Sequence, residues 1–256
     1  MIDDPLFYVL AVAAVMIAGI SKGGFGGGLG TLAVPLMALV IAPQQAAAIM
    51  LPILCVMDLM AVWAYRRNWD RRNMWIMLPG ALAGIAAGGL TFAYLDADMV
   101  RVLVGTLAVG FFAFEVARRW IFDPDRPPAR PAVLRGGFWS AVAGFTSFIA
   151  HAGGPPVNIY LLPQRMPKTL YQGTTVVFYF IINYVKLIPY ALLGQLSFGN
   201  LTTSAVLLPI APLAMLSGIW LHKRVSDRMF YVICYGLLLV TGLKLLYDGI
   251  AGLATG

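Results

Sequence analysis

Long apolar runs are the feature of this sequence that most limits how the chain can fold. The chain is 60% hydrophobic and only 11% charged over 256 residues, whereas soluble domains carry about 25% charged residues. A soluble fold of this length could not bury so much apolar surface, so we predict an all-α polytopic membrane protein. Runs that approach or exceed the roughly 20 residues of a spanning helix are Ala46–Tyr65, Met74–Leu95, Val100–Ala117, Leu170–Leu193, Leu201–Leu221 and Met229–Tyr247.

Two further apolar regions are interrupted by residues that disfavour helices. Pro5–Val40 is too long for one span and contains SKGGFGGGLG at 21–30, and Arg135–Pro163 is interrupted at HAGGPP, 151–156. Because glycine and proline destabilise helix interiors, we expect each region to form two helices or half-helices joined by an irregular tip, at 21–31 and 146–158. The alternative is that the small residues allow neighbouring helices to pack closely.

The two interrupted regions lie about half a chain apart, which suggests an internal repeat. Matches at offsets of 125 and then 130 residues follow one order along the chain: Gly19 with Gly144, Gly28 with Gly153, Asp58 with Asn183, LP at 78–79 with LP at 208–209, and Gly88 with Gly218. The proline-rich stretch FDPDRPPARPAVLR is typical of a linker. We therefore predict a first transmembrane repeat at 1–120, a cytoplasmic linker at 121–134 and a second repeat at 135–256.

Loop charge predicts how the two copies are oriented. The loop at 66–72 has four arginines, which places it in the cytoplasm by the positive-inside rule. Its counterpart at 194–200 is uncharged, while the acidic loop at 95–99 has a basic counterpart at 222–228. Equivalent loops thus change sides, so we predict two inverted-topology repeats, each a broken or re-entrant helical hairpin plus three transmembrane helices. Both chain ends are then outside, and this architecture is typical of secondary transporters.

The two tips have the chemistry of an anion site. Helix starts expose unpaired N–H groups and a partial positive charge, and glycine lets a ligand approach the backbone. Lys22 adds a full charge in a setting where charges are costly. The candidate substrate-binding residues are Ser21, Lys22, Gly23, Gly24, Gly27, Gly28, Thr31, Thr146, Ser147, His151, Gly153, Gly154, Asn158, Asn183 and Lys186.

Other polar residues inside the apolar runs have two interpretations each. Lys186 is either a second cation for an anionic substrate or an ion-pair partner of Asp58. Asp58 and His151 are candidates for proton coupling, and the alternative for both is a structural role. Helical spacing puts Tyr179, Asn183 and Lys186 on one face. Earlier polar residues of that helix line a polar path or bridge between helices: Gln172, Thr174 and Thr175.

Several function classes find no support in the residues. With one histidine at membrane depth, no Cys/His cluster and one mid-span carboxylate, we predict no catalytic residues, no metal site and no enzyme. GGFGGGLG lacks the Gly-Lys-Ser/Thr ending of a phosphate-binding loop, so no cofactor is expected. The net charge of +7 lies mostly in short loops, where it sets orientation and does not indicate nucleic acid. Cys55 and Cys234, inside apolar runs, are interpreted as reduced packing residues.

Two stretches, GISKGGFGGGLGTLAVPLM and AGFTSFIAHAGGPPVNIYLLPQRMPKTLYQGTT, carry a family resemblance. A glycine-rich first hairpin followed by VPL, a second copy with GG and proline, and a basic, proline-rich linker resemble the sulfite exporter TauE/SafE family over nearly the whole chain. The resemblance implies a multi-pass protein of the bacterial inner membrane that moves sulfur-containing anions such as sulfite or sulfonates. The second copy departs from the family pattern, since HAGGPPVN stands where a second GxGGG is expected.

These observations favour a secondary transporter that exports a small sulfur-containing anion, sulfite or an organosulfonate, by alternating access, with the anion held at two helix N-termini near the midplane. An anion channel and a non-transporting membrane scaffold or assembly factor remain the alternatives. The expected partners are the anionic substrate and the lipid bilayer, with a homodimer left open. Both termini are predicted to be periplasmic.

Overall fold

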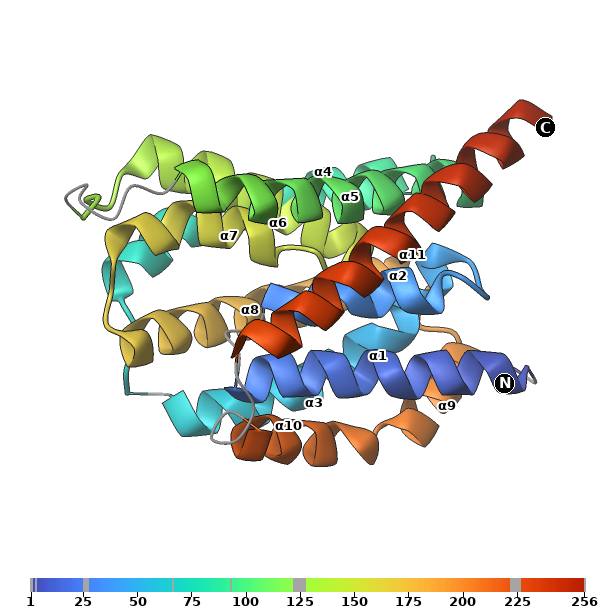
Figure 1. The fold of residues 1–256 in the computed structure, drawn as a ribbon, viewed down its shortest axis with the longest axis horizontal. Coiled ribbons are helices and arrows are strands. Elements are labelled where there is room, and N and C mark those ends of the chain that lie inside the picture. Colours follow the sequence, from blue (N-terminus) through green and yellow to red (C-terminus); the bar gives the residue numbers. More distant parts are fainter. Residues whose placement is uncertain are drawn as a thin grey trace.

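The computed structural model describes residues 1–256 except 1, 3, 25–27, 66, 93, 122–127, 222–226 and 256. All regular structure in these residues is helical, as predicted (Figure 1). The first half contains α1 (Pro5–Gly24), η1 (Gly28–Leu32), α2 (Ala33–Met37), α3 (Pro43–Tyr65), α4 (Arg71–Phe92) and α5 (Ala97–Ile121). The second half contains α6 (Val133–Ala150), α7 (Gly154–Leu161), η2 (Leu162–Gln164), α8 (Lys168–Leu192), α9 (Phe198–Leu207), α10 (Ile210–Leu221) and α11 (Asp227–Thr255).

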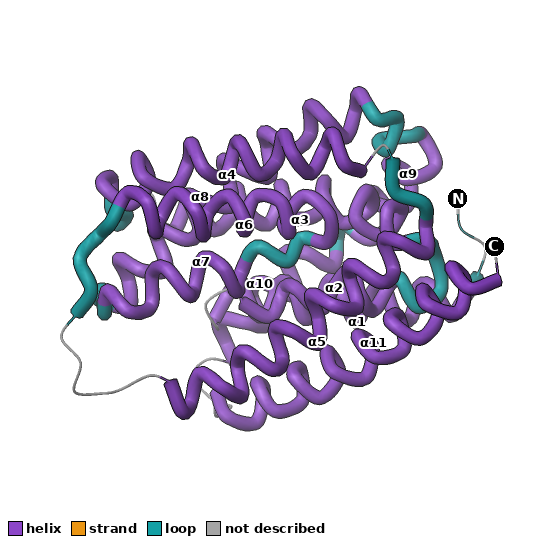
Figure 2. Tube along the Cα trace, turned by 90° about the horizontal axis from the view of Figure 1, so that it is seen from above, coloured by secondary structure: helices purple, strands orange, loops and turns teal. Residues whose placement is uncertain are grey.

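Seven of the described helices are long and apolar enough to cross a membrane, and α9 with α10 forms an eighth, bent pair. The predicted single run Leu201–Leu221 is therefore wrong as one helix, because its two halves meet at an angle of 45°. Pro209 lies at the bend, and proline cannot donate the hydrogen bond that would continue α9. Figure 2 shows the long helices side by side, with most of the loops at two ends of the molecule and one loop near its middle.

The two interrupted regions have shorter irregular parts than the sequence predicts. Helix α1 continues through Gly24 and helix α6 through Ala150, so residues 21–24 and 146–150 are helical. Gly23 stays in the helix because α1 packs closely on α10, where a side chain at Gly23 would collide with the backbone of Met215. Close packing, the alternative interpretation of the glycines, therefore explains this part of the tract. Residues 25–27 lie outside the described residues.

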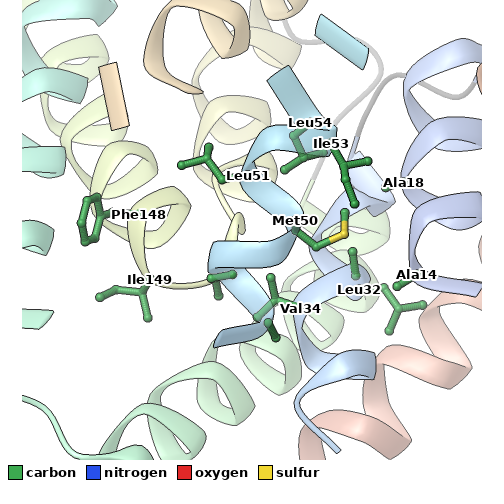
Figure 3. Close-up of a cluster of buried hydrophobic side chains, with 14 of the residues drawn as sticks. Ala14, Ala18, Leu32, Val34, Met50, Leu51, Ile53, Leu54, Phe148 and Ile149 are labelled. Carbon is green, nitrogen blue, oxygen red and sulfur yellow. The ribbon is translucent and has the colours of Figure 1, made fainter. Parts of the chain in front are cut away.

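Helix α3 occupies the centre of the apolar core. Figure 3 shows its side chains between Ala14 and Ala18 of α1 on one side and Phe148 and Ile149 of α6 on the other. The residues of α3 labelled there are Met50, Leu51, Ile53 and Leu54, which are all buried. A helix with no polar face suits such a central position. Any charged residue on α3 is therefore enclosed by protein.

The main helix contacts join one half of the chain to the other. Helix α1 packs along α10, α4 along α6, α5 along α11, and α3 along α8. Gly19 of α1 is pressed against α10, and Gly144 of α6 is pressed against α4. This crossed pairing is what two related halves would give, and the inverted repeat stays a prediction.

The start of α1 and the end of α11 lie at the same end of the molecule in both views (Figures 1 and 2). The connection from α4 to α5 is at this end, and the connection from α3 to α4 is at the opposite end (Figure 1). The termini therefore share an end with the acidic loop, as the sequence predicts. Which compartment each end faces stays a prediction from loop charge.

The α4–α6 contact gives a direct test of the fold. A Cβ added at Gly84 of α4 would collide with the backbone oxygen of Ala141 in α6. We expect Gly84→Ala to lower the free energy of unfolding by about 1–3 kcal/mol, because the two backbones must separate. Gly110→Ala on α5 is the control, since nothing lies within 4 Å of that position. Denaturant titration in micelles measures both variants, and equal stabilities would contradict the contact.

Candidate functional site

A small cavity lies where the end of α1, the turn between α6 and α7, and helices α3 and α8 meet. Its volume is about 40 Å³, enough for roughly three water molecules, which is the scale of a small anionic headgroup. Both halves of the chain contribute to its wall. The lining residues are Lys22, Gly30, Leu54, Asp58, Ser147, His151, Gly154, Gln172, Thr175, Val176, Tyr179 and Asn183.

Helical periodicity explains which side chains reach the cavity. Gln172, Thr175, Tyr179 and Asn183 recur every three or four residues along α8, so they share one face of that helix. Leu54 and Asp58 of α3 are related in the same way. The cavity is therefore a polar seam between two helices that are otherwise packed by apolar residues.

A buried ion pair forms one side of the site. The ammonium of Lys22 contacts Oδ1 of Asp58, and the Asn183 amide donates a hydrogen bond to Oδ2 of Asp58 over 2.6 Å. The Asp58 side chain is only 1% exposed and that of Lys22 13%. The suggested ion pair of Asp58 with Lys186 is wrong, because α1 brings Lys22 to the carboxylate instead. Within the described residues Asp58 is the one hydrogen-bond partner of the Lys22 ammonium, which has three N–H groups.

Lys186 lies behind the opposite wall and is fully buried. Its three N–H groups are used by neutral acceptors: the Ser147 carbonyl at 2.9 Å, the Ser147 hydroxyl at 2.9 Å and His151 Nδ1 at 2.8 Å. Nε2 of His151 lies 2.9 Å from the Ala47 carbonyl, which can only accept. Nε2 therefore carries the ring proton, and Nδ1 accepts from Lys186. This network assigns a neutral imidazole to His151.

The backbone at His151 fixes the direction of its ring. His151 follows α6 in the left-handed conformation, with φ of 53°, which histidine adopts more readily than most residues. The N–H of Ala152 then reaches back to the carbonyl of Thr146 over 3.2 Å and closes the end of α6. The turn that ends α6 thus directs the imidazole toward α3 and Lys186.

The start of α7 supplies fewer amide donors than the sequence-based prediction of an amide-lined pocket requires. Pro155 and Pro156 occupy its first turn, as expected for proline, but neither has an N–H group. The N–H of Val157 is already bonded to the Gly153 carbonyl. Gly154 lines the cavity, and its N–H has no backbone partner among the described residues. Positive charge at the site therefore comes chiefly from side chains.

The other predicted site residues that the structure describes are not among the lining residues of this cavity. Thr31 and Thr146 line a second, mostly apolar cavity of about 200 Å³ between α5, α6, α7 and η1. Asn158 accepts a 2.5 Å hydrogen bond from the hydroxyl of Tyr171, and Ser21 is buried in α1. Gly153 precedes α7, Gly24 ends α1 and Gly28 begins η1. Gly27 lies outside the described residues.

Some lining residues were not among the predicted site residues. Gln172, Thr175 and Tyr179 could be found from their helical spacing to Asn183, and the structure brings all three to the cavity. Thr174 instead joins α8 to the loop before α4, since its hydroxyl accepts from the N–H of Asp70 over 2.9 Å. Gly30, Leu54 and Val176 carry no sequence signal that separates them from ordinary packing residues.

The arrangement defines a polytopic α-helical membrane protein with a charged cavity between its two halves. Among the residues whose side chains are described, no group of three His, Cys, Asp or Glu side chains could hold a metal ion. The sequence pattern of the sulfite exporter TauE/SafE family matches residues 11–245, so the chain belongs to this family. The family consists of transporters and not of enzymes. No curated protein and no solved structure matches the chain.

The ion pair predicts a strong coupling between two positions. Lys22→Met or Asp58→Asn alone should lower the free energy of unfolding by about 3–5 kcal/mol, because each leaves the other group buried without its partner. The double variant should lose much less than the sum of the two. Denaturant titration of the four proteins in micelles measures the coupling energy. Additive losses would show that the two groups do not depend on one another.

Proposed function

We propose that the protein is a secondary transporter of a small sulfur-containing anion, sulfite or an organosulfonate, which it exports across the bacterial inner membrane. The family supports an exporter of sulfite or a related sulfur anion. One observation from the site carries the choice of an anion. Two lysines and one aspartate are gathered at the cavity, and the histidine between them is neutral.

The charge count favours one class of solute. With both lysines protonated and Asp58 ionised, the site has one positive charge in excess, because Asp58 pairs with Lys22 while Lys186 has only neutral acceptors. An unbalanced charge inside a membrane protein is costly. A monovalent anion in the cavity removes the excess, whereas a neutral solute leaves it and a cation increases it.

Lys22, the Gly154 amide and the Asn183 side chain are the proposed anion ligands, since all three line the cavity. Lys22 has N–H groups to spare among the described residues. Lys186 contributes through Ser147 and His151, which it holds in the wall. The anion is thus held mainly by cationic and amide side chains, with one helix start as an additional donor.

Alternating access follows from the proposed relation between the halves. The order of elements is similar in each: a long helix, a break, short helices and then the remaining long segments. The bond between Asp58 and Asn183, which are 125 residues apart, joins the positions that the repeat pairs. We propose two inverted repeats that rock about this cavity, with 121–134 as the cytoplasmic linker and both termini in the periplasm.

Transport by reconstituted protein tests the function. Proteoliposomes should take up radiolabelled sulfite in a saturable manner. Lys22→Gln should lower the rate at low substrate about 10- to 100-fold, because a hydrogen bond to a charged group is lost. Lys244→Gln is the matched control, since that lysine pairs with Asp248 on the exposed side of α11. Unchanged flux in Lys22→Gln would overturn the site, non-saturating flux would indicate a channel, and no flux a scaffold.

Proton coupling at Asp58 gives a separate prediction. The carboxylate and the anion compete for Lys22, so protonation of Asp58 should release Lys22 for the anion. The charged or titratable groups around Asp58 are Lys22 of α1, Cys55 of α3 and, on α8, Tyr179, Tyr184 and Lys186. His151, at the α6–α7 turn, lines the same cavity. We expect sulfonate binding to strengthen as pH falls, and Asp58→Asn to abolish this dependence.

A pH titration of methanesulfonate affinity measures the effect, because that anion keeps one charge throughout. His151→Asn is the comparison, since asparagine tolerates the left-handed backbone but lacks the ring. If the pH dependence survives Asp58→Asn and disappears in His151→Asn, the histidine and not the aspartate carries the proton.

A further inference from the structure

One hydroxyl in the wall of the cavity has no use in the network described above. Tyr179 lines the cavity, and its hydroxyl is buried without a hydrogen-bond partner among the described residues. Buried polar groups are nearly always bonded, so such an exception calls for a ligand, a water molecule or a special role. The position of this hydroxyl decides between them.

Three other side chains have a buried polar atom without a partner in the described part of the chain: Tyr8, Gln44 and Tyr160. None of the three lines the charged cavity. Tyr179 is therefore the member of this group that is placed beside Lys22 and Asp58. If hydrogen-bond partners were simply scarce in the core, unpaired polar atoms would not be expected beside Lys22 and Asp58 in particular.

The surroundings of Tyr179 hold its ring in place. The residue lies one helical turn before Asn183 on the cavity face of α8. Its ring edge lies against Gly153, where an added Cβ would approach Cε1 of the tyrosine to 3.3 Å. Phe178 packs edge-on against it with ring centroids 5.4 Å apart. Gly153 thus acts as a positioning residue that leaves room for the ring at the α6–α7 turn.

We infer that the Tyr179 hydroxyl donates a hydrogen bond to the transported anion and, together with Lys22 and the Gly154 amide, selects a monovalent headgroup with three oxygens. This inference rests on the proposed anion transport and adds the class of substrate. Three donors from three elements, α1, α7 and α8, line the same small space. A sulfonate or hydrogensulfite offers one oxygen to each of them, and its single charge matches the single positive excess of the site.

A neutral hydrogen-bond donor selects a monovalent anion better than a third cation would. An additional lysine or arginine would raise the excess charge to two and favour divalent anions. A hydroxyl adds no charge, and its O–H group donates only to an acceptor that lies in the direction of the O–H bond. A carboxylate has two oxygens, so two of the three donors would have to share one oxygen, whereas a sulfonate offers a separate oxygen to each donor. The site should therefore prefer a sulfonate over a carboxylate of equal charge.

The test compares Tyr179→Phe with wild type, because this substitution removes the oxygen and keeps the ring. Binding of methanesulfonate and of acetate is measured by competition with radiolabelled sulfite on the purified full-length protein. We expect the affinity for methanesulfonate to fall about ten- to 100-fold, the size of one hydrogen bond to a charged group. The affinity for acetate should change less, so the preference for the sulfonate becomes smaller. Tyr184→Phe, on the same helix but outside the cavity lining, is the control and should change neither affinity.

Stability separates a ligand role from a packing role. Without any anion, Tyr179→Phe should be at least as stable as wild type, because it removes a buried hydroxyl that no described residue hydrogen-bonds. If methanesulfonate affinity is unchanged in Tyr179→Phe but lost in Lys22→Gln, the tyrosine is not a ligand and the anion site stands. If the affinities for both anions fall equally and the variant is less stable than wild type, the tyrosine is structural and the inference is overturned. If the wild type binds neither sulfite nor methanesulfonate, the proposed function fails as well.

Discussion

The buried ion pair between Lys22 and Asp58 is the interaction on which the site depends. It joins the end of α1 to the middle of α3, and the Asn183 amide adds α8 to the same carboxylate. Charged groups at this depth are costly unless each has a partner, so the three helices are held together at one point. The glycine-rich end of α1 can remain helical because this pair and the close contact with α10 both restrain it.

The hydrogen bonds around the cavity cross between the halves of the chain. Asp58 is bonded to Asn183, the Ala47 carbonyl to His151, and the Lys22 carbonyl to Gln172 over 3.3 Å. A buried donor or acceptor that loses its partner costs about 1–3 kcal/mol. A relative movement of the halves would therefore break or rearrange the hydrogen bonds around the cavity. This is the property that a carrier requires, since substrate occupancy and the arrangement of the halves must be linked.

Much of the architecture was predictable, because a segment that spans the lipid must be a helix of about 20 mostly apolar residues. The apolar runs located the long helices, and the two interruptions located the turns that border the cavity. The sequence could not show that Lys22 lies inside α1, because glycine propensity was outweighed by packing on α10. It also left the partner of Asp58 open, since that choice depends on which helix is adjacent. Tyr179 was recognisable only as a member of a helical face, because a tyrosine in an apolar helix is ordinary.

The two lysines have different bonding, and this difference suggests a division of roles. Lys186 has all three N–H groups committed to neutral acceptors, so its charge is fixed in place behind the wall. Lys22 is bonded to Asp58, and in the mechanism we propose its charge passes between this carboxylate and a solute. A fixed charge lowers the cost of bringing an anion into the cavity, and an exchangeable charge lets the anion leave again. A site built from fixed charges alone would bind the anion and retain it, whereas transport requires binding that can be reversed.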